Sequence, residues 1–259
     1  MKSIIFKLSG KALDEFTTNK KWVKVLEDAK ENYDGVIIVH GAGSQISEWS
    51  KLLKIEPKFL NGMRVTDIKT MEVVAAVQSG LLNSKIVSYL QTNKISAMGL
   101  TGIDRGFFKA EYIHEDFGYV GIPKAEGSNV WIKQLMEDGI VPVFSTVCKD
   151  EDGNLMNINA DLFTQVLAES LGSSTVVFIT DVDGVRIGGA YKDNISIAEI
   201  NKGIETGEIT DGMIPKMHSC IEMINRGVEK LWIGRDYLDS FTGKGTWIIK
   251  EVAQNSMAI

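Results

Sequence analysis

The sequence predicts an α/β protein with a mainly parallel central sheet, and two observations carry this prediction. Short runs of β-branched and other apolar residues alternate with longer segments of helical period, which is the order expected of βαβ units. Each apolar run also leads into a loop that carries Gly, Asn or Asp. The predicted strands are residues 4–8, 36–39, 97–100, 140–144 and 176–179. Because ligands of such sheets gather at the carboxyl ends of the strands, the following loops are where a site is expected.

The clearest helix is predicted over residues 67–92. Asp67 follows Thr66 and can cap the first turn of this helix. The apolar positions at helical spacing are Met71, Val74, Ala75, Leu81, Leu82 and Ile86. A second helix is predicted to open at residues 159–161 and to end near Gly172, which suits a C-terminal cap.

Residues 101–127 follow a different pattern. Residues 107–113 and 117–122 are two segments separated by charged and Gly residues, which predicts two antiparallel strands in a lid or hairpin insertion. The chain shows no internal repeat and no Pro- or Ser-rich linker. If there are two lobes, they are residues 1–173 and 174–259, with the break between a finished helix and a new strand.

Composition and charge exclude several classes of protein. The chain has 259 residues, 44% hydrophobic and 24% charged, which is typical of a globular protein. With a net charge of −6 and no run of basic residues, no nucleic-acid partner is expected. No apolar stretch suits a membrane span or signal peptide, so we expect no membrane partner and a cytoplasmic location. Cys148, Cys220 and the histidines share no metal-ligand spacing, and no hydrolase motif occurs, so no metal-binding side chains are expected.

Two of the strand-following loops contain groups suited to binding an anion. Lys7 lies inside the first apolar run, and a turn of small residues follows it. Residues 40–44, His-Gly-Ala-Gly-Ser, end the second strand, and backbone N–H groups of a Gly-rich turn before a helix can bind an anion. From the residues alone, Lys7 can equally be a charge that protects an edge strand, and the glycines can form a tight turn without a ligand.

Three further segments place polar side chains beside helix starts or strand ends. Residues 157–161 would aim two amides and the Asp161 carboxylate across a helix N-terminus, or simply cap that helix. The two carboxylates of residues 180–184 are either turn formers or ligands of sugar hydroxyls. Lys216 lies near a helix N-terminus, where a cation is unfavourable unless an anion also binds. Two lysines, glycine N–H groups and one aspartate together suit phosphoryl transfer.

Taken in order, these motifs resemble the amino-acid kinase family. The resemblance covers nearly the whole chain, from Lys7 to residues 245–248, which resemble the family's last strand. The most specific segments resemble those of members that phosphorylate N-acetyl-L-glutamate. Residues 61–66 are similar to their substrate signature, residues 157–161 to their NxNAD segment and residues 210–216 to their TGGMxxK segment.

The resemblance implies the amino-acid kinase fold, a three-layer αβα sandwich with a central, mainly parallel sheet. It implies that the lobe of residues 1–173 binds the acyl amino acid and dimerises, and that the lobe of residues 174–259 binds ATP. The implied reaction is ATP-dependent phosphorylation of the side-chain carboxylate of N-acetyl-L-glutamate to N-acetyl-L-glutamyl 5-phosphate, in arginine biosynthesis. Mg²⁺ would be held chiefly by phosphate oxygens and water.

The resemblance also assigns roles to individual residues. Lys7 would neutralise the transferring phosphoryl group, Lys216 would lie beside the leaving β-phosphate, and Asp161 would orient both lysines. Arg64 would pair with the substrate α-carboxylate. The implied catalytic residues are Lys7, Gly10, Gly43, Asp161 and Lys216. The implied substrate-binding residues are Gly41, Ala42, Gly43, Arg64, Asn157 and Asn159, and those implied to bind ATP are Asp181, Val182, Asp183, Gly184, Glu208, Ile209, Thr210 and Met213.

The chain departs from the family pattern at two positions. Ser9 stands where the family usually has the first Gly of a pair, and in this departure the chain resembles bacterial UMP kinase. Ala42 replaces the middle Gly of a triplet, a variant also found in isopentenyl phosphate kinase. The Cβ of Ala42 is expected either to narrow the acyl pocket or to strain a turn with positive φ. Neither relative carries segments like residues 61–66 and 157–161, and residues 45–53 lack the catalytic His of the isopentenyl phosphate enzyme.

Alternatives remain at this stage. The chain can be another phosphotransferase of the family, acting on N-succinylglutamate, N-acetylaminoadipate or UMP, or a catalytically silent nucleotide or amino-acid sensor. Arginine-sensitive members are implied to carry an additional N-terminal helix that links dimers into a hexamer. Only three residues precede the first predicted strand, less than one helical turn. We therefore expect a homodimer that arginine does not inhibit, with residues 67–92 forming the dimer face or packing internally.

Overall fold

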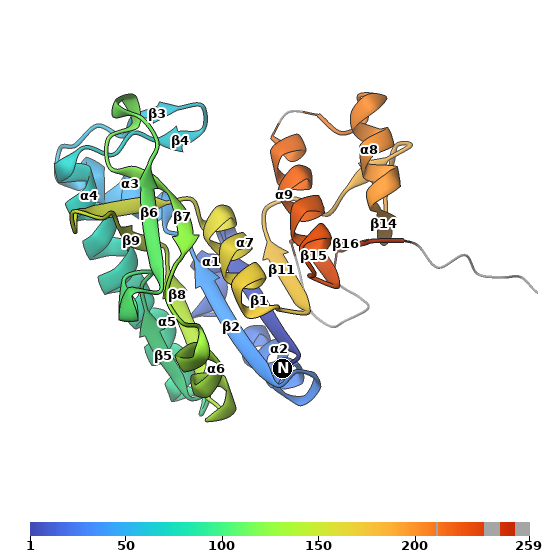
Figure 1. Cartoon of the computed structure of the whole chain (residues 1–259), viewed down its shortest axis with the longest axis horizontal. Helices are drawn as coiled ribbons and strands as arrows, with labels where there is room; N and C mark the ends of the chain where they lie inside the picture. The colour runs from blue at the N-terminus through green and yellow to red at the C-terminus, as the bar shows by residue number, and fades with distance from the viewer. Residues whose placement is uncertain (211, 236–243, 252–259) are drawn as a thin grey trace, which may run out of the picture.

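The computed structural model describes residues 1–210, 212–235 and 244–251, and an eight-stranded sheet lies at the centre of this part of the chain (Figure 1). Across the sheet the strands are β14 (Asn194–Ser196), β16 (Gly245–Ile249), β15 (Lys230–Gly234), β11 (Thr175–Ile179), β1 (Ser3–Leu8), β2 (Gly35–His40), β8 (Val141–Ser145) and β5 (Ala97–Leu100). Neighbouring strands are parallel except β15 and β16, which are antiparallel. The mainly parallel sheet and all five predicted strands are confirmed.

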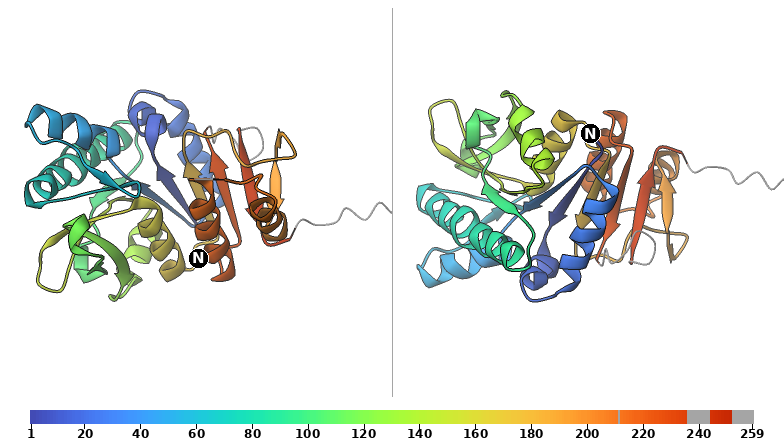
Figure 2. Two further views of the ribbon diagram at one scale, coloured as in Figure 1. Left: turned by 90° about the horizontal axis from the view of Figure 1, so that it is seen from above. Right: turned by 90° about the horizontal axis from the view of Figure 1, so that it is seen from below.

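Helices cover both faces of this sheet, which confirms the predicted three-layer αβα sandwich (Figure 2). One face carries α1 (Gly10–Phe16), α2 (Lys21–Asn32), α3 (Gly43–Leu52), α4 (Ile68–Val74), the π-helix η1 (Ala75–Leu82) and α5 (Asn83–Thr92). The other face carries α6 (Val130–Glu137), α7 (Ala160–Leu171) and α9 (Met213–Asn225), with α8 (Ile197–Glu205) beside β14.

The side chains of β1 alternate between these two layers. Ile4, Phe6 and Leu8 pack in the core beneath α1 to α5, whereas Ile5 packs in the core beneath α6 to α9. Because successive side chains of a strand point to opposite faces, Lys7 lies on the same face as Ile5. β1 pairs with β2 on one side and with β11 on the other, so the edge-strand interpretation of Lys7 is wrong.

The predicted helix over residues 67–92 is confirmed as the continuous run of α4, η1 and α5. The side chain of Asp67 accepts a hydrogen bond from the backbone N–H of Thr70 at 2.8 Å, as a capping residue does. The π-helical middle of this run was not predicted. The helix α7 is also confirmed, with Asn159 as its N-cap and Gly172, at φ 65°, as its left-handed C-cap.

The predicted hairpin is present, and it belongs to a second sheet instead of forming a separate lid. This sheet has the order β6 (Phe108–Tyr112), β7 (Val120–Ala125), β10 (Leu155–Ile158) and β9 (Val147–Lys149). The β6–β7 pair is antiparallel, as predicted. β10 is parallel to β7 and pairs Asn157 with Val120. The hairpin is therefore hydrogen-bonded to β10, the strand that leads into α7.

Shorter elements complete the described chain. Asn61 and Gly62 join β3 (Phe59–Leu60) to β4 (Met63–Arg64) with φ values of 50° and 77°, as a type I′ turn requires. The remaining elements are η2 (Asp104–Gly106), η3 (Glu115–Phe117), β12 (Arg186–Ile187) and β13 (Ala190–Tyr191). Both cysteines are free and buried. Among the described helices, none is long and apolar enough to cross a membrane.

Candidate active site

Two lysines meet one aspartate at the carboxyl end of the central strands. Lys7 Nζ lies 2.6 Å from Asp161 Oδ1, and Lys216 Nζ lies 3.3 Å from Asp161 Oδ2. Lys7 projects from β1, Asp161 from the first turn of α7 and Lys216 from the first turn of α9. The structure therefore brings together three residues that were predicted from separate parts of the sequence. Lys216 also lies 5.8 Å from the centre of the Phe178 ring.

The surroundings shift the pKa values of Lys7 and Asp161. Burial lowers the pKa of Lys7; the Asp161 carboxylate opposes that change, and the Lys216 charge adds to it. Burial acts to raise the pKa of Asp161, but the charges of Lys7 and Lys216 outweigh it and leave that pKa below its usual value. Asp161 is therefore ionised at neutral pH, and it holds two ammonium groups that would otherwise repel each other.

Backbone N–H groups from two helix starts lie at the same end of the sheet. Gly10 begins α1 directly after β1, and Gly43 begins α3 two residues after Gly41. Ala42 has φ −157° and is 3% exposed, so its Cβ causes no positive-φ strain. The prediction of strain at Ala42 is therefore wrong, because φ is negative at that residue. Gly41, Ala42 and Gly43 instead line a pocket together.

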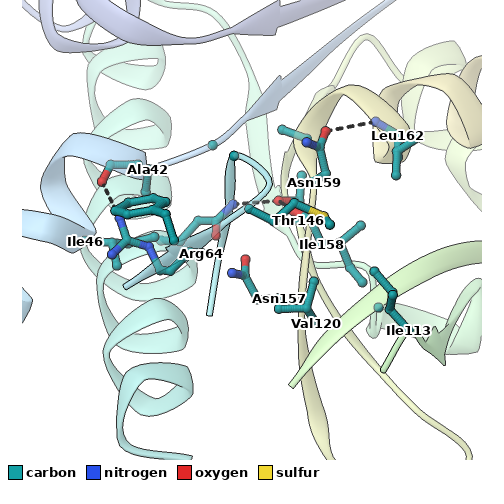
Figure 3. A pocket seen from close by; sticks show the side chains of 18 residues that line it. Ala42, Ile46, Arg64, Ile113, Val120, Thr146, Asn157, Ile158, Asn159 and Leu162 are labelled. Carbon is teal, nitrogen blue, oxygen red and sulfur yellow. Dashed lines mark hydrogen bonds between the residues drawn. The ribbon is translucent and has the colours of Figure 1, made fainter. Parts of the chain in front are cut away.

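This pocket, of about 210 Å³, lies between the glycine turn and the second sheet. Figure 3 shows Arg64 on one side of the pocket and Asn157, Ile158 and Ile113 on the other. Asn159 and Ala160 also line the pocket, and they precede Asp161 in the chain. The pocket therefore extends from the β3–β4 hairpin toward the two lysines.

Arg64 is 8% exposed and is held by one end of its guanidinium group. Its Nη2 donates to the carbonyl of Gly43 at 2.9 Å and to Ser47 Oγ at 2.7 Å. The guanidinium carbon lies 4.8 Å from the centre of the Phe59 ring. Within the described residues, the buried Nη1 has no hydrogen-bond partner. Because a buried donor without a partner is costly, Nη1 is available to an anionic ligand in the pocket.

The two predicted asparagines use their side chains differently. Asn157 Nδ2 donates to Thr66 Oγ1 at 3.1 Å, and the residue lines the pocket. Asn159 Oδ1 accepts from the backbone N–H groups of Asp161, at 2.8 Å, and Leu162, at 3.3 Å. The capping interpretation thus holds for the oxygen of Asn159, which fixes the first turn of α7 and the position of Asp161.

The loop after β11 holds four of the residues predicted to bind ATP, Asp181 to Gly184. Asp183 Oδ1 lies 3.1 Å from Arg235 Nε, and Arg235 Nη2 donates to the carbonyl of Asp181 at 2.6 Å. Val182 packs against the core. Gly184, at φ 122°, lies against Thr246, where a Cβ would come within 2.6 Å of the hydroxyl. Arg235 was not predicted, although its place directly after a strand was a usable signal.

The other residues predicted to bind ATP, Glu208 to Thr210 and Met213, differ in how much of each side chain a ligand can reach. Glu208 accepts a hydrogen bond from the backbone N–H of Gly188, so it fastens the β12–β13 turn. The side chain of Ile209 is 3% exposed and belongs to the core, which leaves only its backbone for a ligand. Thr210 is exposed, and Met213 is half-buried at the start of α9. A side-chain role in binding is thus open to Thr210 and Met213 and closed to Ile209.

Comparison with known proteins identifies the family. A family model described as the amino acid kinase family matches residues 2–235. This chain belongs to the amino acid kinase family. Among curated members, the acetylglutamate kinase of Bacillus velezensis is 33% identical over 255 residues, covering 96% of this chain and 97% of the relative. The acetylglutamate kinase of Kosmotoga olearia is 37% identical over 234 residues, covering 90% and 83%.

Solved structures share the amino acid kinase fold of this chain. A protein of Streptococcus mutans UA159 has a TM-score of 0.82 at 26% identity, covering 96% of this chain and 99% of that one. N-acetylglutamate synthase from Neisseria gonorrhoeae, complexed with coenzyme A and N-acetyl-glutamate, has a TM-score of 0.80 at 20% identity, covering 97% and 60%. Giardia lamblia carbamate kinase bound to AMP-PNP has a TM-score of 0.67 at 17% identity, covering 96% and 99%.

One buried histidine borders the glycine turn of this kinase fold. His40 Nδ1 lies 3.0 Å from the Gly41 carbonyl, which can only accept, so Nδ1 carries the proton. Asn83 Nδ2 donates to His40 Nε2 at 3.0 Å and to the Val143 carbonyl at 2.9 Å. Burial lowers the pKa of His40 to about 4, so the ring is neutral in the folded protein.

We expect this neutral ring to make the protein less stable in mild acid. Below the unfolded-state pKa of about 6.5, the His40 ring of the unfolded chain binds a proton. In the folded protein the same ring stays neutral until the pH falls to about 4. Between pH 7 and pH 5, wild type should lose about 2 kcal/mol more unfolding free energy than His40→Gln. Urea denaturation at both pH values measures this difference, and equal losses would show that His40 does not titrate as described.

Proposed function

We propose that this protein transfers the γ-phosphoryl group of ATP to the side-chain carboxylate of N-acetyl-L-glutamate. The observation that carries this proposal is the approach of two ammonium groups, those of Lys7 and Lys216, to the single carboxylate of Asp161. Two cations and one anion leave a net positive charge, which suits phosphate oxygens. The near-full-length similarity to acetylglutamate kinases supports N-acetyl-L-glutamate as the acceptor. No observation favours the silent sensor or the other phosphotransferases.

The pocket supplies what an acyl amino acid needs. The buried Arg64 Nη1 would donate to the α-carboxylate of the substrate, in a charge-assisted hydrogen bond. The amide of Asn157 would fix the amino-acid end from the opposite wall, while apolar residues such as Ile113 and Val120 would contact the acyl group. This arrangement directs the side-chain carboxylate of the substrate toward Asn159 and the lysines.

ATP would approach from the loops of the second lobe. The Asp181–Gly184 loop, held by Arg235, and the segment from Glu208 to Met213 would contact the nucleotide. MgATP would be the substrate, with Mg²⁺ bound by phosphate oxygens and water. Among the described residues, no group of three or more His, Cys, Asp or Glu side chains could hold a metal ion.

The transfer itself needs no covalent enzyme intermediate. A side-chain carboxylate oxygen attacks the γ-phosphorus in line, and the bond from that phosphorus to the β–γ bridging oxygen breaks. The products are the acyl phosphate and ADP. Lys7, with the N–H groups of Gly10 and Gly43, would neutralise the transferring phosphoryl group, and Lys216 would neutralise charge on the leaving side. An ionised carboxylate is already a nucleophile, so no general base is required.

The proposal includes two lobes and a homodimer. The acyl amino acid would bind within residues 1–173 and ATP chiefly within residues 174–259, although β1 and β11 pair across that boundary in one sheet. The dimer would use the exposed side of η1 and α5, where Leu81 is 37% exposed. Sedimentation at several protein concentrations tests the dimer, and a monomer at all of them would contradict it.

The test of the acceptor is Arg64→Ala. We expect KM for N-acetyl-L-glutamate to rise roughly 10- to 10²-fold, since a charge-assisted hydrogen bond to the α-carboxylate is lost in both ground and transition states. KM for ATP should stay within about twofold. ADP release, with hydroxylamine to trap the acyl phosphate, measures both constants.

The matched control is Arg226→Ala. Arg226 Nη1 lies 2.9 Å from Glu169 Oε2 and takes no part in lining the pocket, so its removal should leave both KM values unchanged. An unchanged KM for N-acetyl-L-glutamate in Arg64→Ala would remove Arg64 from the site. Failure of wild type to form a hydroxamate from N-acetyl-L-glutamate would overturn the proposed function itself.

A further inference from the structure

The π-helix η1 turns polar side chains toward the ends of the central strands. Gln78 is 2% exposed and Asn83 is 5% exposed, although both belong to a helix whose other buried residues are mainly apolar. In an α-helix, residues five apart lie roughly 140° apart around the axis. The i→i+5 bonding of a π-helix brings such residues close to one face. Gln78 and Asn83 can therefore both reach the strand ends.

Gln78 joins two strand ends that border the substrate pocket. Its Nε2 donates to the His40 carbonyl at 3.1 Å and to Thr146 Oγ1 at 2.8 Å. The Thr146 hydroxyl in turn donates to the Ile158 carbonyl at 2.9 Å. Figure 3 shows Thr146 beside Ile158, and both Gln78 and Thr146 line the pocket. A chain of hydrogen bonds thus runs from the residue before the glycine turn to the residue after Asn157.

The Thr146 hydroxyl serves both hydrogen bonds at the middle of this chain. A hydroxyl offers one donor and two acceptor positions, so Thr146 can accept from Gln78 and donate to Ile158 at the same time. In a buried site, loss of either partner would leave a carbonyl or amide group without a hydrogen bond. Backbone bonds also join these strands, because the Ile158 N–H donates to the Thr146 carbonyl at 3.2 Å and His40 pairs with Ser145 in the sheet. The Gln78 and Thr146 side chains add a second link between the end of β2 and Ile158.

We propose that Gln78 is a positioning residue for phosphoryl transfer, which sets the spacing between the Gly41–Gly43 turn and the strand that carries Asn157. The inference rests on the proposed function, because it assigns the phosphoryl group to the turn and the acceptor to Asn157. In-line transfer depends on the distance between the two reactants, and misplacement by about 1 Å can cost 10²-fold in rate. Gln78 would act through the two walls of the pocket, by way of the His40 carbonyl and Thr146.

The test compares two glutamines of one long helix. Gln78→Leu removes both hydrogen bonds with little change in volume. Gln91 Nε2 donates to the Ala97 carbonyl at 3.2 Å, at the opposite end of the strands, so Gln91→Leu is the matched control. We expect Gln78→Leu to lower kcat roughly 10- to 10²-fold, with KM for ATP within about twofold. We expect Gln91→Leu to keep the wild-type kcat. Equal kcat values in the two variants would overturn the proposal.

Thr146→Val is a second test of the positioning role of Gln78. It breaks the chain at its middle, so kcat should fall as in Gln78→Leu, and the double variant should lose little more than either single one. Independent, multiplying losses would contradict a shared chain of hydrogen bonds. If Gln78→Leu does not fold, Thr146→Val against Gln91→Leu decides the question alone.

Hydrogen exchange separates this inference from the proposed function. Amides in residues 41–46 and 157–162 should exchange faster in Gln78→Leu than in Gln91→Leu, whatever the substrate is. Wild type that does not phosphorylate N-acetyl-L-glutamate, together with this exchange pattern, would contradict the proposed function and leave the spacing role supported. Unchanged exchange in both segments, beside an active wild type, would contradict the role of Gln78 alone.

Discussion

Replacing Lys7 with alanine is expected to lower kcat by roughly 10²-fold or more, which is the scale of a lost donor to transition-state charge. Lys216→Ala should cause a loss of the same order. Both ammonium groups contact Asp161 and would face charge that moves during transfer, from the γ-phosphoryl group to the leaving ADP. Because neither lysine contacts the pocket around Arg64, KM for N-acetyl-L-glutamate should change little. Initial rates at saturating MgATP measure both effects.

The control for these lysines is Lys230→Ala. Lys230 begins β15, at the amino end of the same sheet, and its Nζ lies 4.5 Å from the centre of the Trp247 ring. It should keep the wild-type kcat, because it lies at the end of the strands away from the cluster. A near-normal kcat in Lys7→Ala would make Lys7 a structural partner of Asp161 only.

Asp161→Asn is expected to lower kcat by roughly 10²-fold and to change the pH profile. Burial already lowers the pKa of Lys7, and the Asp161 carboxylate is the group that opposes this change. Without that carboxylate the pKa of Lys7 falls further, so the amine loses its proton at a lower pH. The alkaline limb of the kcat profile should therefore move to lower pH. Rates measured from pH 6 to pH 10 test this shift.

The matched control for Asp161→Asn is Asp150→Asn, which removes the same charge from the β9–β10 turn. The Asp150 carboxylate accepts from the backbone N–H of Asn154 at 2.8 Å and contacts neither lysine. Its pH profile should match that of wild type. A profile unchanged in Asp161→Asn would show that Lys7 keeps its charge by other means, and that Asp161 does not tune it.

Local sequence patterns predicted five strands of the central sheet, the bounds of two helices and the family. Apolar strands and helix caps depend on residues that are adjacent in the sequence. Asp67, Asn159 and Gly172 could therefore be assigned as caps or helix ends from sequence patterns. The family was readable because residues 61–66, 157–161 and 210–216 each keep a local pattern. Lys7, Asp161 and Lys216 could be named in this way, although the distances between them could not.

Several interpretations that the sequence left open depend on contacts between distant parts of the chain. Strand order made β1 a central strand, and that excluded an edge role for Lys7. The backbone at Ala42 has a negative φ of −157°, so the Cβ there causes no positive-φ strain. Ile209 entered the core, and Gln78 reached His40 and Thr146 through a π-helical turn. Contacts of this kind join residues that are distant in sequence, so no local pattern encodes them.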